Sequence, residues 1–237
     1  MGRTHMDVTY FRQARKQAGL NQQRAAAELG VSQSYLSMLE NGERSLSPEL
    51  ARRMVHVYKL SPVALPPDQG LWERKMAGPE QLAADLDGLG YPGFGYLRKH
   101  RSKRNPSELL LTALAQDHLE ARLFEALPWL VLKYWDMDTD WLVQQAKLHD
   151  LQNRLGFVVS LARSAGRRAG FTNPQSDAAL ERLETTLKRS LLAREDSLGE
   201  TKTSDAEHKW LKRHRPKEAR DWNVLSNWRA EALRYVA

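Results

Sequence analysis

Hydrophobic residues recur at helical spacing along most of the chain, and residues that start and stop helices divide its first 60 residues into four short helices. We predict helices over 9–18, 21–29, 32–41 and 47–58, followed by a short turn at 61–67. Asn21, Ser32 and Ser47 have the side chains that cap helix N-termini, and glycines close the first three helices. Four short, closely spaced helices indicate a compact bundle.

The pattern is interrupted between residues 66 and 106, where prolines and glycines are frequent. We expect irregular structure here around one short helix at 79–86. The stretch RKHRSKR at 98–104 holds five Lys or Arg side chains. This part of the chain is predicted to be a partly basic linker.

Helical periodicity returns after Asn105-Pro106. We predict one helix to about residue 126 that stops at Pro128, a shorter one at 129–135, a long one at 140–165, another at 176–197 and a last one at 216–237. No segment has the alternation of a strand. The sequence therefore predicts an all-α protein with three parts, a helix-turn-helix bundle at 7–66, a linker at 67–105 and a larger helical domain at 106–237.

Composition narrows the class of protein. The 237 residues include 36 Lys or Arg and 29 Asp or Glu, a net charge of +7 that fits a polyanion-binding protein. Because there is no cysteine, disulfides, thiolate catalysis and cysteine-based zinc sites are excluded. No apolar run approaches the roughly 20 residues of a membrane helix, and no signal peptide is visible. We expect a cytoplasmic protein that does not interact with a membrane.

Residues 21–41 meet the requirements of two helices joined by a tight turn. Ala25 and Ala26 are small enough for a helix crossing, and Gly30 suits a turn with positive φ. Leu29, Val31, Leu36 and Leu39 fit the core. The remaining face of the second helix carries Gln33, Ser34 and Ser37, next to an N-terminus capped by Ser32.

This is the arrangement with which a helix-turn-helix reads DNA, because the start of its second helix enters the major groove. Glutamine can pair with adenine through two hydrogen bonds, and serine can donate or accept one. Gln22, at the start of the first helix, is placed to meet a phosphate. A helix-turn-helix used only for protein contacts is the simpler alternative.

The stretch AGLNQQRAAAELGVSQSYLSMLENGERSLSPEL resembles the phage-repressor-like, or XRE, family of DNA-binding domains. The resemblance implies a lambda-repressor-like bundle in which Arg15 and Glu40 form a buried ion pair. It implies base contacts from Gln33, Ser34 and Ser37 and backbone contacts from Gln22, Gln23, Ser32, Tyr35, Asn41 and Arg44. Here Glu43 partly offsets the charge of Arg44, which leaves room for extra phosphate contacts elsewhere. Either such contacts or a solvated linker would explain the basic residues Arg98, Lys99, Arg101, Lys103 and Arg104.

The remaining features leave several roles open. The segment 208–220 has six Lys or Arg and one Glu, which suits a second DNA contact, an acidic partner or a solvated helix flank. The predicted helix at 216–237 is either a docking or dimer element or part of the core. His208 and His214 are six residues apart with no acidic residue nearby to complete a ligand set, so we expect no metal site. Neither a phosphate loop nor a catalytic constellation is recognisable, so we expect no cofactor and no enzymatic activity.

Three functions compete at this point. The first is a transcriptional repressor that binds a double-stranded DNA operator as a homodimer, since one small DNA-binding domain buries little surface against DNA. The second is an antitoxin that represses its own promoter and neutralises a toxin through its C-terminal domain. The third is a protein-interaction module that does not bind DNA.

Overall fold

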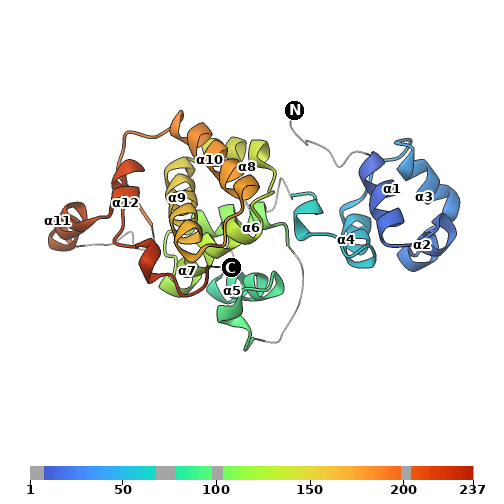
Figure 1. The fold of residues 1–237 in the computed structure, drawn as a ribbon, viewed down its shortest axis with the longest axis horizontal. Coiled ribbons are helices and arrows are strands. Elements are labelled where there is room, and N and C mark those ends of the chain that lie inside the picture. Colours follow the sequence, from blue (N-terminus) through green and yellow to red (C-terminus); the bar gives the residue numbers. More distant parts are fainter. Residues whose placement is uncertain (1–7, 68–77, 98–103, 199–203, 237) are drawn as a thin grey trace.

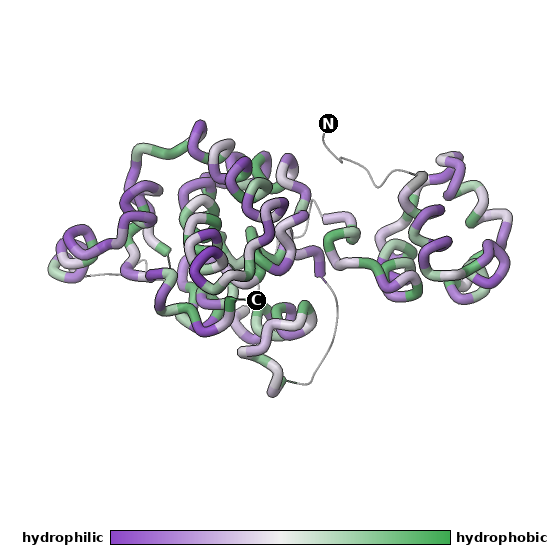
Figure 2. The backbone as a smooth tube through the Cα atoms, viewed as in Figure 1, coloured by the Kyte–Doolittle hydropathy of each residue, from purple (hydrophilic) through white to green (hydrophobic). Residues whose placement is uncertain are grey.

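The structure is a computed structural model that describes residues 8–67, 78–97, 104–198 and 204–236. Nearly all of its regular structure is helical, which confirms the predicted all-α class (Figure 1). A small N-terminal bundle lies at one end of the molecule and a larger helical body occupies the rest. Helices of both parts carry hydrophobic and hydrophilic stretches, as amphipathic helices do (Figure 2).

The N-terminal bundle has its own hydrophobic core. Its helices are α1 (Val8–Gln17), α2 (Gln22–Leu29), α3 (Gln33–Glu40) and α4 (Pro48–Val57). The 3₁₀ turn η1 (Pro62–Ala64) follows α4 and packs against the larger body. Phe11, Leu29, Leu36, Leu50 and Met54 are buried in one cluster. All four helices therefore close around a single core, and their bounds lie within about one residue of the predicted ones.

The larger body is built around α9 (Gln152–Ala169), which packs against helices on several sides. Around it lie α5 (Pro79–Gly88), η2 (Pro92–Phe94), α6 (Pro106–Leu114), α7 (Ala121–Lys133), α8 (Thr139–Leu148) and α10 (Pro174–Lys188). The chain ends with β1 (Asp196–Ser197), α11 (Asp205–His214), α12 (Lys217–Asp221), β2 (Val224–Leu225) and η3 (Ala230–Ala232). β1 and β2 pair in parallel, with Asp196 opposite Val224.

Residues 79–97 do not behave as the linker that we expected. Leu82, Leu86, Tyr91 and Phe94 are buried in the same core as α6 to α9. The hydroxyl of Tyr134 also donates to the carbonyl of Leu89 at 2.8 Å. Burial of these apolar side chains fixes α5 and η2 on the larger body.

Three further predictions in this part are wrong. The helix expected from residue 106 to about 126 is two helices, α6 and α7, with residues 115–120 between them. Pro128 does not end a helix but lies buried inside α7. The predicted helix at 140–165 is split at Asp150, whose φ of 58° is left-handed. The split lets α8 and α9 pack against each other, since the Leu151 N–H closes the turn on the carbonyl of Ala146 at 2.8 Å.

The last third of the chain also differs from the prediction. The helix expected to start at Ser176 starts at Pro174, capped by Asn173, and ends at Lys188. The helix expected at 216–237 is only the five-residue α12, because Asn223 takes a left-handed φ of 51° and the chain then pairs as β2. Trp222 follows α12 and is 1% exposed, with its indole N–H donating to Ser160 on α9 at 2.7 Å.

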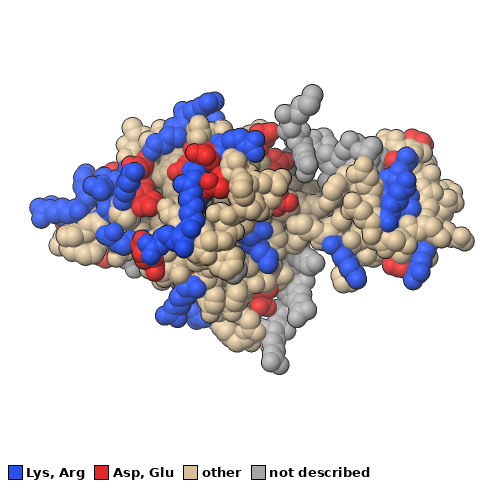
Figure 3. Space-filling model, in the orientation of Figure 1, with Lys and Arg blue, Asp and Glu red and all other residues tan. Residues whose placement is uncertain are grey.

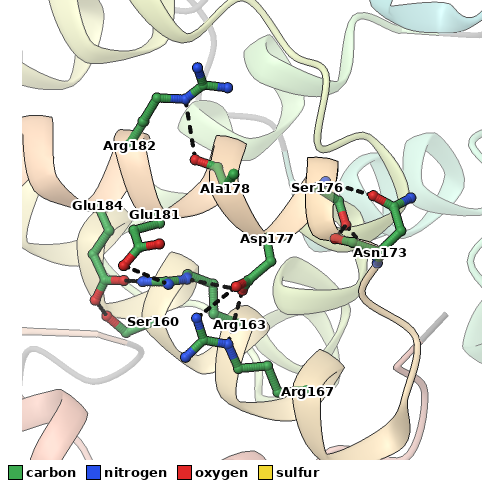
Figure 4. A network of polar contacts seen from close by, with 10 residues as sticks. All are labelled: Ser160, Arg163, Arg167, Asn173, Ser176, Asp177, Ala178, Glu181, Arg182 and Glu184. Carbon is green, nitrogen blue, oxygen red and sulfur yellow. Dashed lines mark hydrogen bonds and ion pairs between the residues drawn. The ribbon is translucent and has the colours of Figure 1, made fainter.

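Charged side chains hold α9 to α10 at the surface of the larger body (Figure 4). Arg163 on α9 is ion-paired with Asp177, Glu181 and Glu184 on α10. Arg167, one turn further along, binds both carboxylate oxygens of Asp177 at 2.9 and 2.7 Å. A hydrogen bond from Arg167 lowers the pKa of the Asp177 carboxyl.

Candidate DNA-binding site

The turn between α2 and α3 is built by local signals in the sequence. The Asn21 side chain accepts a hydrogen bond from the N–H of Arg24, which caps α2. Gly30 ends that helix with a left-handed φ of 66°. The Ser32 hydroxyl then accepts from the N–H of Tyr35 at 3.1 Å and caps α3. The two helices form a helix-turn-helix.

The buried side of this motif consists of small and aliphatic residues. Ala25 and Ala26 are 0% and 2% exposed, so α2 can approach its neighbours closely. Leu36 and Leu39 anchor α3 to the same core. The position of α3 is therefore set by the packing of one face.

The opposite face of α3 is open. Gln33 and Ser34 are exposed, and Ser37 one turn later is half-buried. These three residues belong to the first two turns of the helix, the part that enters a major groove in a helix-turn-helix. Tyr35 is half-buried and packs against the bundle core.

A buried ion pair joins α1 to the end of α3. The Arg15 guanidinium binds Glu40 through two bonds, Nε to Oε1 at 2.6 Å and Nη2 to Oε2 at 3.0 Å. The two residues are 8% and 3% exposed. Such a pair fixes geometry more than it adds stability, because both charges lose their water.

Arg12 reinforces this junction, which sequence reasoning missed. Its guanidinium donates to the carbonyl of Glu40 at 3.3 Å and to Oδ1 of Asn41 at 2.5 Å. Arg12 lies three residues before Arg15 and so shares its helix face, a spacing that would have pointed to it. The Asn41 oxygen is thus already hydrogen-bonded.

The pKa of the Glu40 carboxyl reports the balance of these contacts. Burial on its own would raise this pKa, but hydrogen bonds from Arg15 and Gln22, together with the charges of Arg15 and Arg12, hold it below its ordinary value of 4.5. The hydrogen bond to Glu40 raises the pKa of Arg15 against the effect of burial. Both groups are therefore charged in the folded protein at neutral pH.

Gln22 connects this ion pair to the exposed face of α3. Its Nε2 donates to Oε2 of Glu40 at 3.0 Å, and its Oε1 accepts from Nε2 of Gln33 at 2.9 Å. Both ends of the Gln22 carboxamide are therefore used within the protein. Within the described residues, the carbonyl oxygen and the second N–H of the Gln33 carboxamide make no hydrogen bond, and these are the groups that a two-bond contact with adenine requires.

The other residues expected at the DNA backbone have different surroundings. Gln23 and Arg44 are exposed. Ser32 is occupied by its capping bond. Arg98, Lys99, Arg101 and Lys103 lie outside the described residues.

Arg104 is not presented to solvent as a phosphate contact would require. Its guanidinium binds Asp85 at 3.2 Å and Glu108 at 2.6 Å, and it also donates to the hydroxyl of Thr112 at 3.1 Å. This arginine therefore holds α5 to α6, and its geometry argues against the phosphate role that the sequence left open.

Comparison with known families agrees with this geometry. Residues 11–65 match a family described as Helix-turn-helix, which confirms the predicted XRE-type domain. No curated protein and no solved structure matches the chain. The match supports a DNA-binding transcription regulator of the XRE type. Among the described helices, none is long and apolar enough to span a membrane.

Proposed function

We propose that the protein is a sequence-specific repressor that binds an operator as a homodimer and reads base edges with Gln33, Ser34 and Ser37. The observation that carries the proposal is the exposed carboxamide of Gln33, which is held by Gln22 while its carbonyl oxygen and second N–H have no partner in the part of the chain that the structure describes. Nothing in the bundle needs these groups for packing, since Leu36 and Leu39 anchor α3.

The proposed backbone contacts come from Gln23, Arg44 and the N-terminus of α2, where the helix dipole favours a phosphate. A dimer is proposed because a single helix-turn-helix contacts too few base pairs for tight specific binding. A dimer places two helix-turn-helix motifs on half-sites about one helical turn apart. The larger body is then the part available for dimerisation.

The experiment is a binding titration of the full chain with duplex DNA from upstream of its own gene and with a scrambled duplex of equal length. Gln33→Ala is expected to weaken binding to the upstream DNA by about 5- to 150-fold, the size of one lost base contact, and to leave the scrambled duplex unaffected. The matched control is Gln13→Ala, the same substitution at an exposed position of α1.

Equal binding of both duplexes by the unmodified protein would exclude the sequence-specific function. Preference for the upstream DNA that survives Gln33→Ala would exclude Gln33 as a reading residue. Nuclease protection of two half-sites, separated by about one helical turn, would support the dimer.

A further inference from the structure

Helix α11 stands apart from the core of the larger body. None of its residues from Asp205 to His214 is buried. It lies at the end of the molecule opposite the N-terminal bundle (Figure 1). The ten residues 208–217 hold five Lys or Arg and no Asp or Glu, and cationic side chains gather over this tip (Figure 3).

One edge of α11 is tied to the body by a carboxylate. Glu195, just before β1, is paired with Lys212 at 3.1 Å, with Arg215 at 3.4 Å and with His208 at 3.7 Å. Lys212 and His208 are one helical turn apart and share a face. This edge accounts for the position of the helix, and its charge is partly neutralised.

The outer face of α11 carries Lys209 and Arg213, with Asp205 one turn before Lys209 on the same side. Lys209 and Arg213 are one turn apart and exposed, and neither has an ion-pair partner within the part of the chain that the structure describes. Beside them the Trp210 ring is 49% exposed and stacks on His214, with ring centres 4.7 Å apart and an angle of 22°. The ring is thus held against His214 at the surface, with Arg213 one turn further along the helix.

A half-exposed tryptophan beside two exposed cations that form no ion pair among the described residues is a surface suited to a polyanion with apolar parts. A solvated helix flank accounts for Lys209 and Arg213, and a partner that covers the exposed half of the Trp210 ring gains the free energy of burying it. The sugar–phosphate backbone of DNA combines regularly spaced negative charge with apolar sugars. Lysine and arginine contacts to it gain free energy by releasing counterions.

We propose that the outer face of α11 is a second, sequence-independent contact for duplex DNA. Lys209 and Arg213 bind phosphates, and Trp210, braced by His214, packs against the sugars between them. The proposal rests on the proposed function for its ligand. Because α11 and α3 lie at opposite ends of the molecule (Figure 1), the second contact falls outside the half-site that α3 reads.

The experiment measures how the affinity of the full chain for a scrambled 30-base-pair duplex falls with salt, for the unmodified protein and for Lys209→Gln/Arg213→Gln. Each lost phosphate contact reduces the slope of log affinity against log salt by about 0.9, so the double variant is expected to lose about 1.8. Lys212→Gln is the matched control, since it removes the same charge from the edge that faces Glu195. The salt slope of this variant should change by less than the value of about 0.9 that one lost phosphate contact gives.

Trp210→Ala gives a second readout, because it is expected to weaken scrambled-DNA binding about 5-fold or more without changing the salt slope. An unchanged slope in the double variant overturns the proposal. The proposal is also overturned if the double variant loses binding to polyglutamate while its salt slope for DNA is unchanged, because α11 would then be a binding surface for an acidic protein. Preference for the upstream duplex over the scrambled one is measured separately, so failure here leaves the operator function standing.

Discussion

The Gln33 carboxamide donates to Oε1 of Gln22 across 2.9 Å, so the exposed side of α3 is held by the first residue of α2. Gln22 cannot rotate freely to make this bond, because its own Nε2 donates to the buried Glu40. The orientation of Gln33 is therefore set by two linked hydrogen bonds, one from Gln33 to Gln22 and one from Gln22 to the buried Glu40.

Gln22→Ala should weaken binding to the upstream duplex although the Gln33 side chain remains. The loss has two physical sources, the freedom gained by Gln33 and the missing acceptor beside it. We expect about a 5- to 10-fold loss, on the order of one neutral hydrogen bond. Anisotropy titrations with Gln13→Ala as control measure it, and full affinity in Gln22→Ala would show that Gln33 needs no support.

Glu40→Gln should strongly destabilise the N-terminal bundle. It leaves the Arg15 guanidinium buried without its counter-charge, a loss of about 3–5 kcal/mol for broken buried pairs. Hydrogen exchange of amides in residues 8–65 of the full chain measures the change, because it separates the bundle from the larger body. Glu49→Gln is the control, since Glu49 is exposed on α4.

Acid should loosen the same bundle in the unmodified protein. The folded pKa of Glu40 lies below its ordinary value of 4.5, so the ionised carboxylate contributes stability above that pH and loses it as pH falls through the lower folded value. Amide protection in residues 8–65 should therefore decline below about pH 4.5. Glu40→Gln should lack this contribution, and an identical pH dependence in both proteins would contradict the assignment.

Gly156→Ala should destabilise the larger body. A Cβ at this position would lie 2.3 Å from the ring of Trp222, a separation that cannot be kept. Displacing Trp222 also strains its hydrogen bond to Ser160, so we expect a loss of about 1–3 kcal/mol or more in urea unfolding. Gly95→Ala is the control, because its Cβ would meet only the carbonyl of Pro92 at 3.6 Å.

The sequence predicted the N-terminal bundle closely because its boundaries are local. Asn21 and Ser32 cap helices with their own side chains, and Gly30 supplies the left-handed turn between them. The amphipathic pattern of α3 also separates its buried leucines from Gln33 and Ser34. None of these features depends on a distant part of the chain.

In the larger body, local signals were misleading where packing is dense. A proline commonly ends a helix, yet α7 continues through Pro128, which is buried in a helix that packs against α9. Conversely, nothing in the periodicity of 140–165 showed the break at Asp150. That break depends on how α8 and α9 pack.

Local features of the sequence are enough to predict the helical class, the helix-turn-helix and the polar residues on its outer face, because capping, turn conformation and helical periodicity act over a few residues. The folded structure was needed to show that Gln22 links Glu40 to Gln33, that Arg104 is bound by Asp85 and Glu108, and that Trp222 is buried while Trp210 is exposed. These relationships join residues far apart in the chain. Their energies depend on burial and on hydrogen-bond geometry, which exist only once the chain has folded.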